Sequence, residues 1–218
     1  MGKIPILTKE QTLILDWVVK DDLLRQQFYF TGGTALATYY LGHRYSEDLD
    51  FFSEKKFDTQ SIFTLLSEWA KKHNFSFNAR LVGPVYICML TFPSVQVKVD
   101  FGYYPYKRLR VGKDYHGLAI DSLLDIAVNK LLTIVQRGEI KDFVDLYFLL
   151  RTFSLWDLIE GVRIKFSMEL EPLLLAGNFL GVEDFDMLPK MVTPVKITEL
   201  KEFFRKQAKR LGASVVKP

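Results

Sequence analysis

The hydrophobic pattern of this chain changes period along its length, and this change limits the folds that it can adopt. From Phe75 to Tyr103 the pattern is that of extended strands, with β-branched and aromatic residues on alternating positions. Two turn-forming pairs, Gly83-Pro84 and Pro93-Ser94, divide this stretch. The predicted strands are residues 75–82, 85–92 and 95–103. Connections this short favour an antiparallel meander.

Beyond Asp121 the apolar residues recur with the helical period almost to the end of the chain. Helices are predicted near residues 122–136, 140–152, 154–165 and 196–210, while residues 174–194 allow no assignment. Residues 105–116 combine turn formers with basic residues and are predicted to form a loop. The pattern therefore predicts an α+β fold, with a small mixed sheet core flanked by helices (residues 1–116, including an N-terminal helix) and a helical C-terminal domain packed on it (residues 117–218).

The N-terminal half adds shorter elements. Residues 28–31 are β-prone and stop at Gly32-Gly33, after which residues 34–41 have helical spacing and end at Gly42. Residues 48–52 are predicted to form a strand and residues 59–73 a helix. The apolar residues Leu13, Ile14, Trp17 and Val18 indicate an amphipathic helix near the N-terminus.

Composition excludes several classes of protein. The single cysteine, Cys88, rules out an internal disulfide and every zinc site built on several cysteines, so a reducing cytoplasm is the expected compartment. We find no secretory signal and no apolar stretch long enough to cross a membrane. The net charge of +3 is compatible with a polyanionic partner such as a nucleotide or RNA but does not require one.

Three aspartates are the candidate catalytic and metal-binding residues. Side chains alternate across a strand, so Asp48 and Asp50 project from one face while Leu49 and Phe51 project from the other. The same alternation places Gln96, Lys98 and Asp100 opposite an apolar face. Clustered carboxylates persist at neutral pH when a cation offsets their repulsion, and Mg²⁺ is the cation that prefers such oxygen ligands. The alternative is that Asp48 and Asp50 simply face solvent.

The candidate phosphate-binding residues are Gly32, Gly33 and Thr34, which open a predicted helix where backbone N–H groups can hold an anion. A Gly-Gly pair can also be no more than a turn. Arg44 and Ser46 lie close enough to the carboxylates to touch phosphate or to hold their loop, and they can equally be ordinary loop residues.

A lysine in an apolar stripe is the next unusual feature. On a helical projection Lys130 lies among Leu123, Ile126, Ala127 and Ile134. Its ammonium either extends to the domain edge or meets a phosphate in the cleft between domains.

The following helix is apolar nearly all round, so Asp142 and Asp145 are expected to be partly buried. They either cap the helix and form ion pairs, or orient Lys130 or a nucleotide base.

Together these motifs resemble a known family. Gly-Gly-Thr, a short helix, Asp-x-Asp on a strand and one Asp on a later strand resemble the signature of DNA polymerase beta-like nucleotidyltransferases. Residues 32–52, Gly-Gly-Thr-Ala-Leu through Ser-Glu-Asp-Leu-Asp-Phe-Phe, are similar to the first motif of AbiEii/AbiGii-type abortive-infection toxins. Residues 125–149 resemble a second block, with Lys130 followed by the Lys141, Asp142 and Asp145 group. This family usually has Asp where Asn129 stands.

The resemblance implies an enzyme that moves a nucleoside monophosphate from an NTP to an acceptor, RNA or tRNA or a protein, with two Mg²⁺ ions as cofactor. Asp48, Asp50 and Asp100 would hold the ions, Gly33 and Thr34 the phosphates, and Lys130 would neutralise phosphate charge. It also implies a toxin of a type IV toxin–antitoxin system whose partner is an antitoxin encoded nearby.

The basic, Tyr-containing loop is either solvated or the place that holds the RNA; its basic residues are Lys107, Arg108, Arg110 and Lys113. Two other functions remain open. One is an inactive nucleotide-binding or regulatory module, against which the complete carboxylate set argues. The other is a nucleotidyltransferase that modifies antibiotics, which predicts an acidic acceptor pocket.

Overall fold

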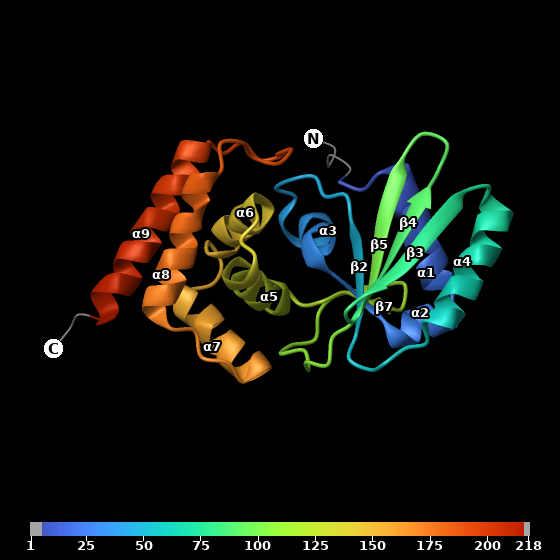
Figure 1. Ribbon diagram of the computed structural model, residues 1–218, viewed down its shortest axis with the longest axis horizontal. Helices are drawn as coiled ribbons and strands as arrows, with labels where there is room; N and C mark the ends of the chain where they lie inside the picture. The colour runs from blue at the N-terminus through green and yellow to red at the C-terminus, as the bar shows by residue number, and fades with distance from the viewer. Residues whose placement is uncertain (1–5, 216–218) are drawn as a thin grey trace. The chain divides into compact units, whose positions relative to one another are not determined.

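The computed structural model describes residues 6–215, with side chains to residue 213 (Figure 1). Internal contacts divide the chain into two compact units. Unit 1 contains the residues up to Tyr40, Ser46–Lys107 and Val111–Asp121. Unit 2 contains Leu41–Tyr45, Arg108–Arg110 and the chain from Ser122 onward. Two short segments, residues 41–45 and 108–110, therefore belong with the C-terminal half although their neighbours in sequence do not.

Unit 1 is built on a five-stranded mixed sheet. Its strands are β1 (Tyr29–Thr31), β2 (Leu49–Ser53), β3 (Ser76–Val82), β4 (Val85–Thr91) and β5 (Gln96–Tyr103). Their order is β1-β2-β5-β4-β3, and β2 runs parallel to β5 while the other pairs are antiparallel. The predicted meander β3-β4-β5 is confirmed. A short ribbon of β6 (Asp114–Tyr115) and β7 (Leu118–Ala119) lies in unit 1 as well.

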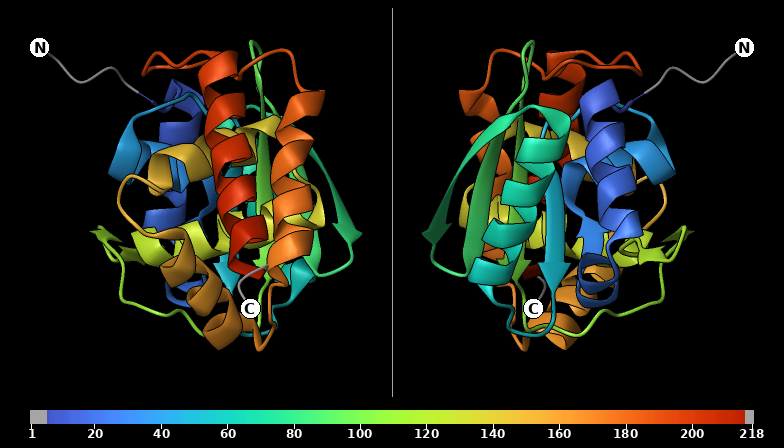
Figure 2. Two further views of the ribbon diagram at one scale, coloured as in Figure 1. Left: turned by 90° about the vertical axis from the view of Figure 1, so that its left-hand side faces the viewer. Right: turned by 90° about the vertical axis from the view of Figure 1, so that its right-hand side faces the viewer.

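Helices α1 (Lys9–Lys20) and α4 (Thr59–His73) lie together over one face of the sheet (Figure 2, right). Trp17 of α1 is the centre of the contact, with its ring 5.3 Å from Trp69 and 5.6 Å from Phe75. Helix α2 (Asp22–Gln27) follows α1. Helix α3 (Gly32–Leu36) continues as a π-helical turn, Ala37–Leu41, so the predicted helix over residues 34–41 is present with a wider last turn.

Unit 2 is helical. Its helices are α5 (Leu123–Gln136), α6 (Ile140–Leu149), α7 (Leu155–Phe166), α8 (Pro172–Leu180), the 3-10 turn Gly181–Asp184 and α9 (Ile197–Val215). Helices α8 and α9 pack side by side (Figures 1 and 2). Phe204 of α9 fills the core, with ring contacts of 5.0 Å to Phe143 and 5.2 Å to Phe179.

The α+β class and the helical C-terminal region are as predicted. The structure also contains elements that were not predicted: α8 and the following 3-10 turn lie where no assignment was made, α2 was not expected, and the end of the predicted 105–116 loop forms β6, which pairs with β7. Helix α8 was missed because its sequence is apolar on most sides, so it has no clear period. The domain boundary at residues 116 and 117 stays a prediction. Within residues 6–215, no helix is long and apolar enough to cross a bilayer.

Candidate functional site

The three predicted carboxylates lie at the β2–β5 pair of unit 1. Asp50 and Asp100 are direct neighbours across these parallel strands. The alternate residues of both strands are buried in the core, including Phe51 and Phe101, so Asp50 and Asp100 share the opposite face. Asp48 comes directly before β2, which begins at Leu49 rather than at the predicted residue 48.

A lysine lies among these carboxylates. Lys98 is two residues before Asp100 on β5, and its Nζ lies 2.7 Å from Asp100 Oδ2 and 3.6 Å from Asp48 Oδ2. Burial is the largest influence on the pKa of Lys98 and lowers it. The hydrogen bond to Asp100 and the charges of Asp100, Asp48 and Asp50 outweigh burial, and the pKa is raised above its ordinary 10.5. The sequence places Lys98 on this polar face, but only the strand pairing shows which carboxylates it meets.

Gly32 fits closely against the same cluster. Its φ is +76°, and a Cβ built there would lie 2.0 Å from Asp50 Oδ2, so no other residue can occupy this position unchanged. The hydroxyl of Thr34 donates a hydrogen bond to the carbonyl oxygen of Asp48. Thr34 is fully buried and Gly33 is buried beside it. The Thr34 side chain therefore holds the backbone before β2. Any contact between Thr34 and a phosphate would have to be made by the backbone N–H of Thr34.

The loop that carries Asp48 is tied to α1. Gln11, 1% exposed, donates through Nε2 to the carbonyl oxygens of Ser46 (2.9 Å) and Glu47 (2.8 Å). Gln11 also closes the capping box of α1 with Thr8. Sequence reasoning missed this contact, because the capping box is local and the link to Ser46 spans 35 residues.

The donor chemistry of this cluster fits a hard divalent cation, since every candidate ligand atom is a carboxylate oxygen. In the structure, the carboxylates of Asp48 and Asp100 lie around the ammonium of Lys98. Among the side chains that the structure describes, no three from His, Cys, Asp and Glu are grouped so that they could hold a metal ion as they stand. Asp50 and Asp100 thus share one sheet face, and Asp48 and Asp100 pair with the ammonium of Lys98.

The other predicted site residues form a buried charge cluster in unit 2. Asp145, fully buried, accepts hydrogen bonds from Arg44 Nε (2.6 Å) and Nη2 (2.8 Å) and lies 2.7 Å from His43 Nε2. Lys130 Nζ lies 2.7 Å from Asp145 and 2.8 Å from Asp142. Segment 41–45 also forms backbone hydrogen bonds with residues 190–193 of unit 2.

Both central groups of this cluster are charged at neutral pH. Burial alone would lower the pKa of Lys130, but Asp145 and Asp142 raise it above its ordinary value. Burial would raise the pKa of Asp145, yet Lys130 and Arg44 hold that pKa well below 3.8. The Lys130 side chain is 10% exposed and its ammonium is paired within this cluster. Asp142 and Asp145 do contact Lys130, and a contact with phosphate stays a prediction.

The predicted basic loop is anchored in unit 2 by one carboxylate. Asp125 accepts from the backbone N–H groups of Leu109 (2.8 Å) and Arg110 (3.1 Å) and from Lys165 Nζ (2.7 Å). The side chain of Arg110 is exposed, and so are those of Lys107 and Lys113. In unit 1, Tyr106 is 38% exposed and its ring packs 4.9 Å from that of Tyr104.

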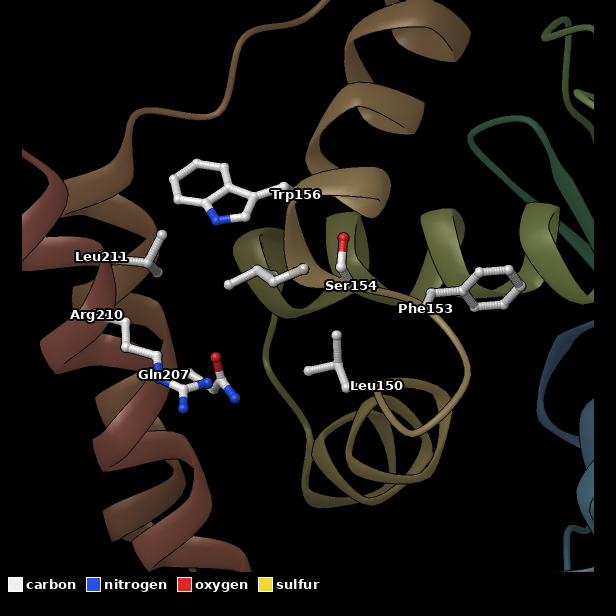
Figure 3. A pocket seen from close by; sticks show the side chains of 8 residues that line it. Leu150, Phe153, Ser154, Trp156, Gln207, Arg210 and Leu211 are labelled. Atoms are coloured by element: carbon white, nitrogen blue, oxygen red, sulfur yellow. The ribbon is translucent and has the colours of Figure 1, made fainter.

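Unit 2 contains a pocket of about 220 Å³ (Figure 3). Gln207 and Arg210 reach into it from α9, and Trp156 faces them from the start of α7. None of the predicted site residues lines it. The carboxylate cluster, rather than this pocket, is therefore the candidate active site.

The chain is similar to known proteins over most of its length. The family described as "Nucleotidyl transferase AbiEii toxin, Type IV TA system" matches residues 15–212. An uncharacterised protein of Aquifex aeolicus (strain VF5) is 32% identical over 210 residues, which cover 93% of this chain and 96% of that protein.

Two crystal structures from Helicobacter pylori have a similar fold. One, named for a proposed nucleotidyltransferase activity, has a TM-score of 0.55 at 19% identity and covers 96% of this chain and 97% of its own. The other, JHP933, has a TM-score of 0.53 at 20% identity, with 96% and 94% covered.

Proposed function

Because this chain belongs to the AbiEii family of nucleotidyltransferase toxins of type IV toxin–antitoxin systems, we propose that it transfers a nucleoside monophosphate from an NTP to an RNA acceptor, with Asp48, Asp50 and Asp100 at the reacting centre. One observation carries the assignment. Asp50 and Asp100 are neighbours on one sheet face, Asp48 directly precedes β2, and the missing Cβ of Gly32 makes room for the Asp50 carboxylate.

We propose Mg²⁺ as the cofactor, two ions held by Asp48, Asp50 and Asp100. Their oxygens are the ligand type that Mg²⁺ prefers, and the ion leaves positions for phosphate oxygens. Bound there, Mg²⁺ would offset the charge that develops on the transferred phosphoryl group and activate the acceptor hydroxyl.

The remaining residues hold this centre in place. Gln11 and Thr34 fix the backbone on either side of Glu47, so that Asp48 enters β2 in one conformation. Gly32, Gly33 and Thr34 are proposed to hold the NTP phosphates through backbone N–H groups. Arg44 is proposed to support nucleotide binding indirectly, because its guanidinium is already paired with Asp145.

Lys130 is proposed to neutralise phosphate charge. An ammonium has three N–H donors, and Asp142 and Asp145 take two of them, which leaves one for a phosphate oxygen. Asp142 and Asp145 would then orient Lys130, and Ser46 would contact phosphate or hold the loop through its carbonyl oxygen.

An RNA acceptor, such as tRNA, is favoured by the loop over residues 105–113. It exposes Tyr106 for stacking, with Lys107, Arg110 and Lys113 for phosphate contacts. Family membership implies an antitoxin partner, and we propose a cytoplasmic location, where NTPs and RNA are available.

The test is transfer of label from each of the four NTPs to total RNA with Mg²⁺. The variant Asp48→Asn/Asp50→Asn should abolish transfer, whereas Asp186→Asn, whose side chain is 97% exposed, should not change it. Transfer that survives the double substitution would refute the assigned centre. NTP binding without transfer to RNA would redirect the search to protein or small-molecule acceptors, and no NTP binding would leave an inactive module.

A cellular experiment tests the toxin role separately. Expression of the wild-type protein alone should arrest growth, and the double variant should not. Growth at the same protein level in both cases would contradict the role as a toxin even if the enzyme is active in vitro.

A further inference from the structure

The position of Lys98 has a consequence for metal binding. Register pairs Leu49 with Val99, so Asp48, one residue earlier, is level with Lys98 on the neighbouring strand. Asp100 lies two residues further on the same face of β5. The ammonium is therefore held between two carboxylates, and the charge of the third, Asp50, acts on it as well.

Without a cation these carboxylates would repel one another. An ammonium carries one positive charge and can donate three hydrogen bonds, so Lys98 can offset part of that repulsion. Mg²⁺ needs the same oxygens at about 2.0–2.1 Å. An ammonium 2.7 Å from Asp100 Oδ2 already occupies that side of the carboxylate, so both cations cannot be held there together.

We infer that Lys98 is a stand-in cation, which holds Asp48, Asp50 and Asp100 together before metal binds and competes with divalent metal for them. The inference rests on the proposed function, because it assumes that these aspartates are the metal ligands. Lys98 is then a positioning residue. Its side chain is 32% exposed and has a flexible four-carbon stem, so it can leave the carboxylates when a metal arrives.

The ion pairs of Lys98 with Asp100 and Asp48 already engage carboxylate oxygens that a metal ion would need. A metal must displace one ion pair before it is bound, which weakens its apparent affinity.

Metal binding is measured with Mn²⁺ alone, by loss of the free Mn²⁺ resonance in EPR titrations of the full-length protein without nucleotide. Lys98→Met removes the competing charge and should bind Mn²⁺ roughly tenfold or more tightly than wild type, because the metal no longer has to displace the ion pairs of Lys98 with Asp100 and Asp48. Lys71→Met, which removes an exposed lysine of α4, is the matched control and should bind as wild type does. Asp100→Asn should lose binding.

The outcomes separate the two proposals. Equal or weaker Mn²⁺ binding by Lys98→Met, with measurable binding by wild type, overturns the role of Lys98 but keeps the metal site. No Mn²⁺ binding by any of these proteins overturns the metal site and the inference together.

A second readout does not depend on affinity. Without metal, Lys98→Met leaves the carboxylates facing one another, so its melting temperature should fall below that of Lys71→Met, and Mn²⁺ should raise it by more than it raises the wild type. An unchanged melting temperature in metal-free buffer contradicts the inference. Lys98→Gln, which keeps a polar end group, replaces Lys98→Met in both measurements if the latter does not fold.

Discussion

Replacement of Asp145 by asparagine should be among the most destabilising single substitutions in unit 2. Asp145 is fully buried and faces two cations, Arg44 and Lys130, together with His43. The Asp145 carboxylate is the ion-pair partner of both Arg44 and Lys130. Asp145→Asn keeps the shape of the side chain but leaves one positive charge without a counterion.

The magnitude follows from the burial of the pair. Removal of one partner from a buried, hydrogen-bonded ion pair costs about 3–5 kcal/mol, because the remaining charge stays desolvated. For a protein of this size each kcal/mol lowers the melting temperature by roughly 2–4 °C. The expected loss is therefore on the order of 10 °C.

The assay is denaturant unfolding of wild type and variant at pH 7, supported by thermal melting. Asp157→Asn is the matched control: it also removes one carboxylate from a helix of unit 2, but Asp157 is an exposed member of the capping box of α7, so its loss should cost much less stability. If Asp145→Asn loses no more stability than Asp157→Asn, the buried cluster does not stabilise the fold as argued here.

Three further results are expected. Gly32→Ala should lose roughly 1–3 kcal/mol of stability from left-handed strain and from contact with Asp50. This loss should exceed that of Gly83→Ala, because Gly83 also has a positive φ (+56°) but open space around it. Equal losses in denaturant unfolding would contradict the contact with Asp50. The folded-state pKa of Asp145 is depressed, so the stability that its charge contributes is present above its ordinary pKa of 3.8 and is lost as pH falls further. The difference in unfolding free energy between wild type and Asp145→Asn should therefore stay constant from pH 7 to about 5 and narrow below about pH 4. An unchanged difference at pH 3 would refute this. Gln11→Leu leaves the carbonyl oxygens of Ser46 and Glu47 without their donor and should cost about 1–3 kcal/mol in the same unfolding assay. The variant should also bind Mn²⁺ more weakly than wild type. Wild-type Mn²⁺ affinity would argue against a role for Gln11 in placing Asp48.

The sequence by itself determined the elements and the faces of the strands. Side chains alternate between the two faces of a strand, and one face of β2 and β5 is buried. The face that carries Asp50 and Asp100 could therefore be predicted from the apolar residues next to each of them. The meander and most helices followed from periodicity in the same way. These are local properties, because each depends on neighbours a few residues apart.

Tertiary structure decided which charges meet. Lys98 becomes level with Asp48 only because β2 pairs with β5 in parallel, and Arg44 reaches Asp145 across 101 residues of chain. Neither pairing leaves a periodic signal, since an isolated lysine or arginine is equally compatible with solvent. The cost of burying a charge without a partner selects these pairs, and that cost depends on three-dimensional burial rather than on sequence spacing.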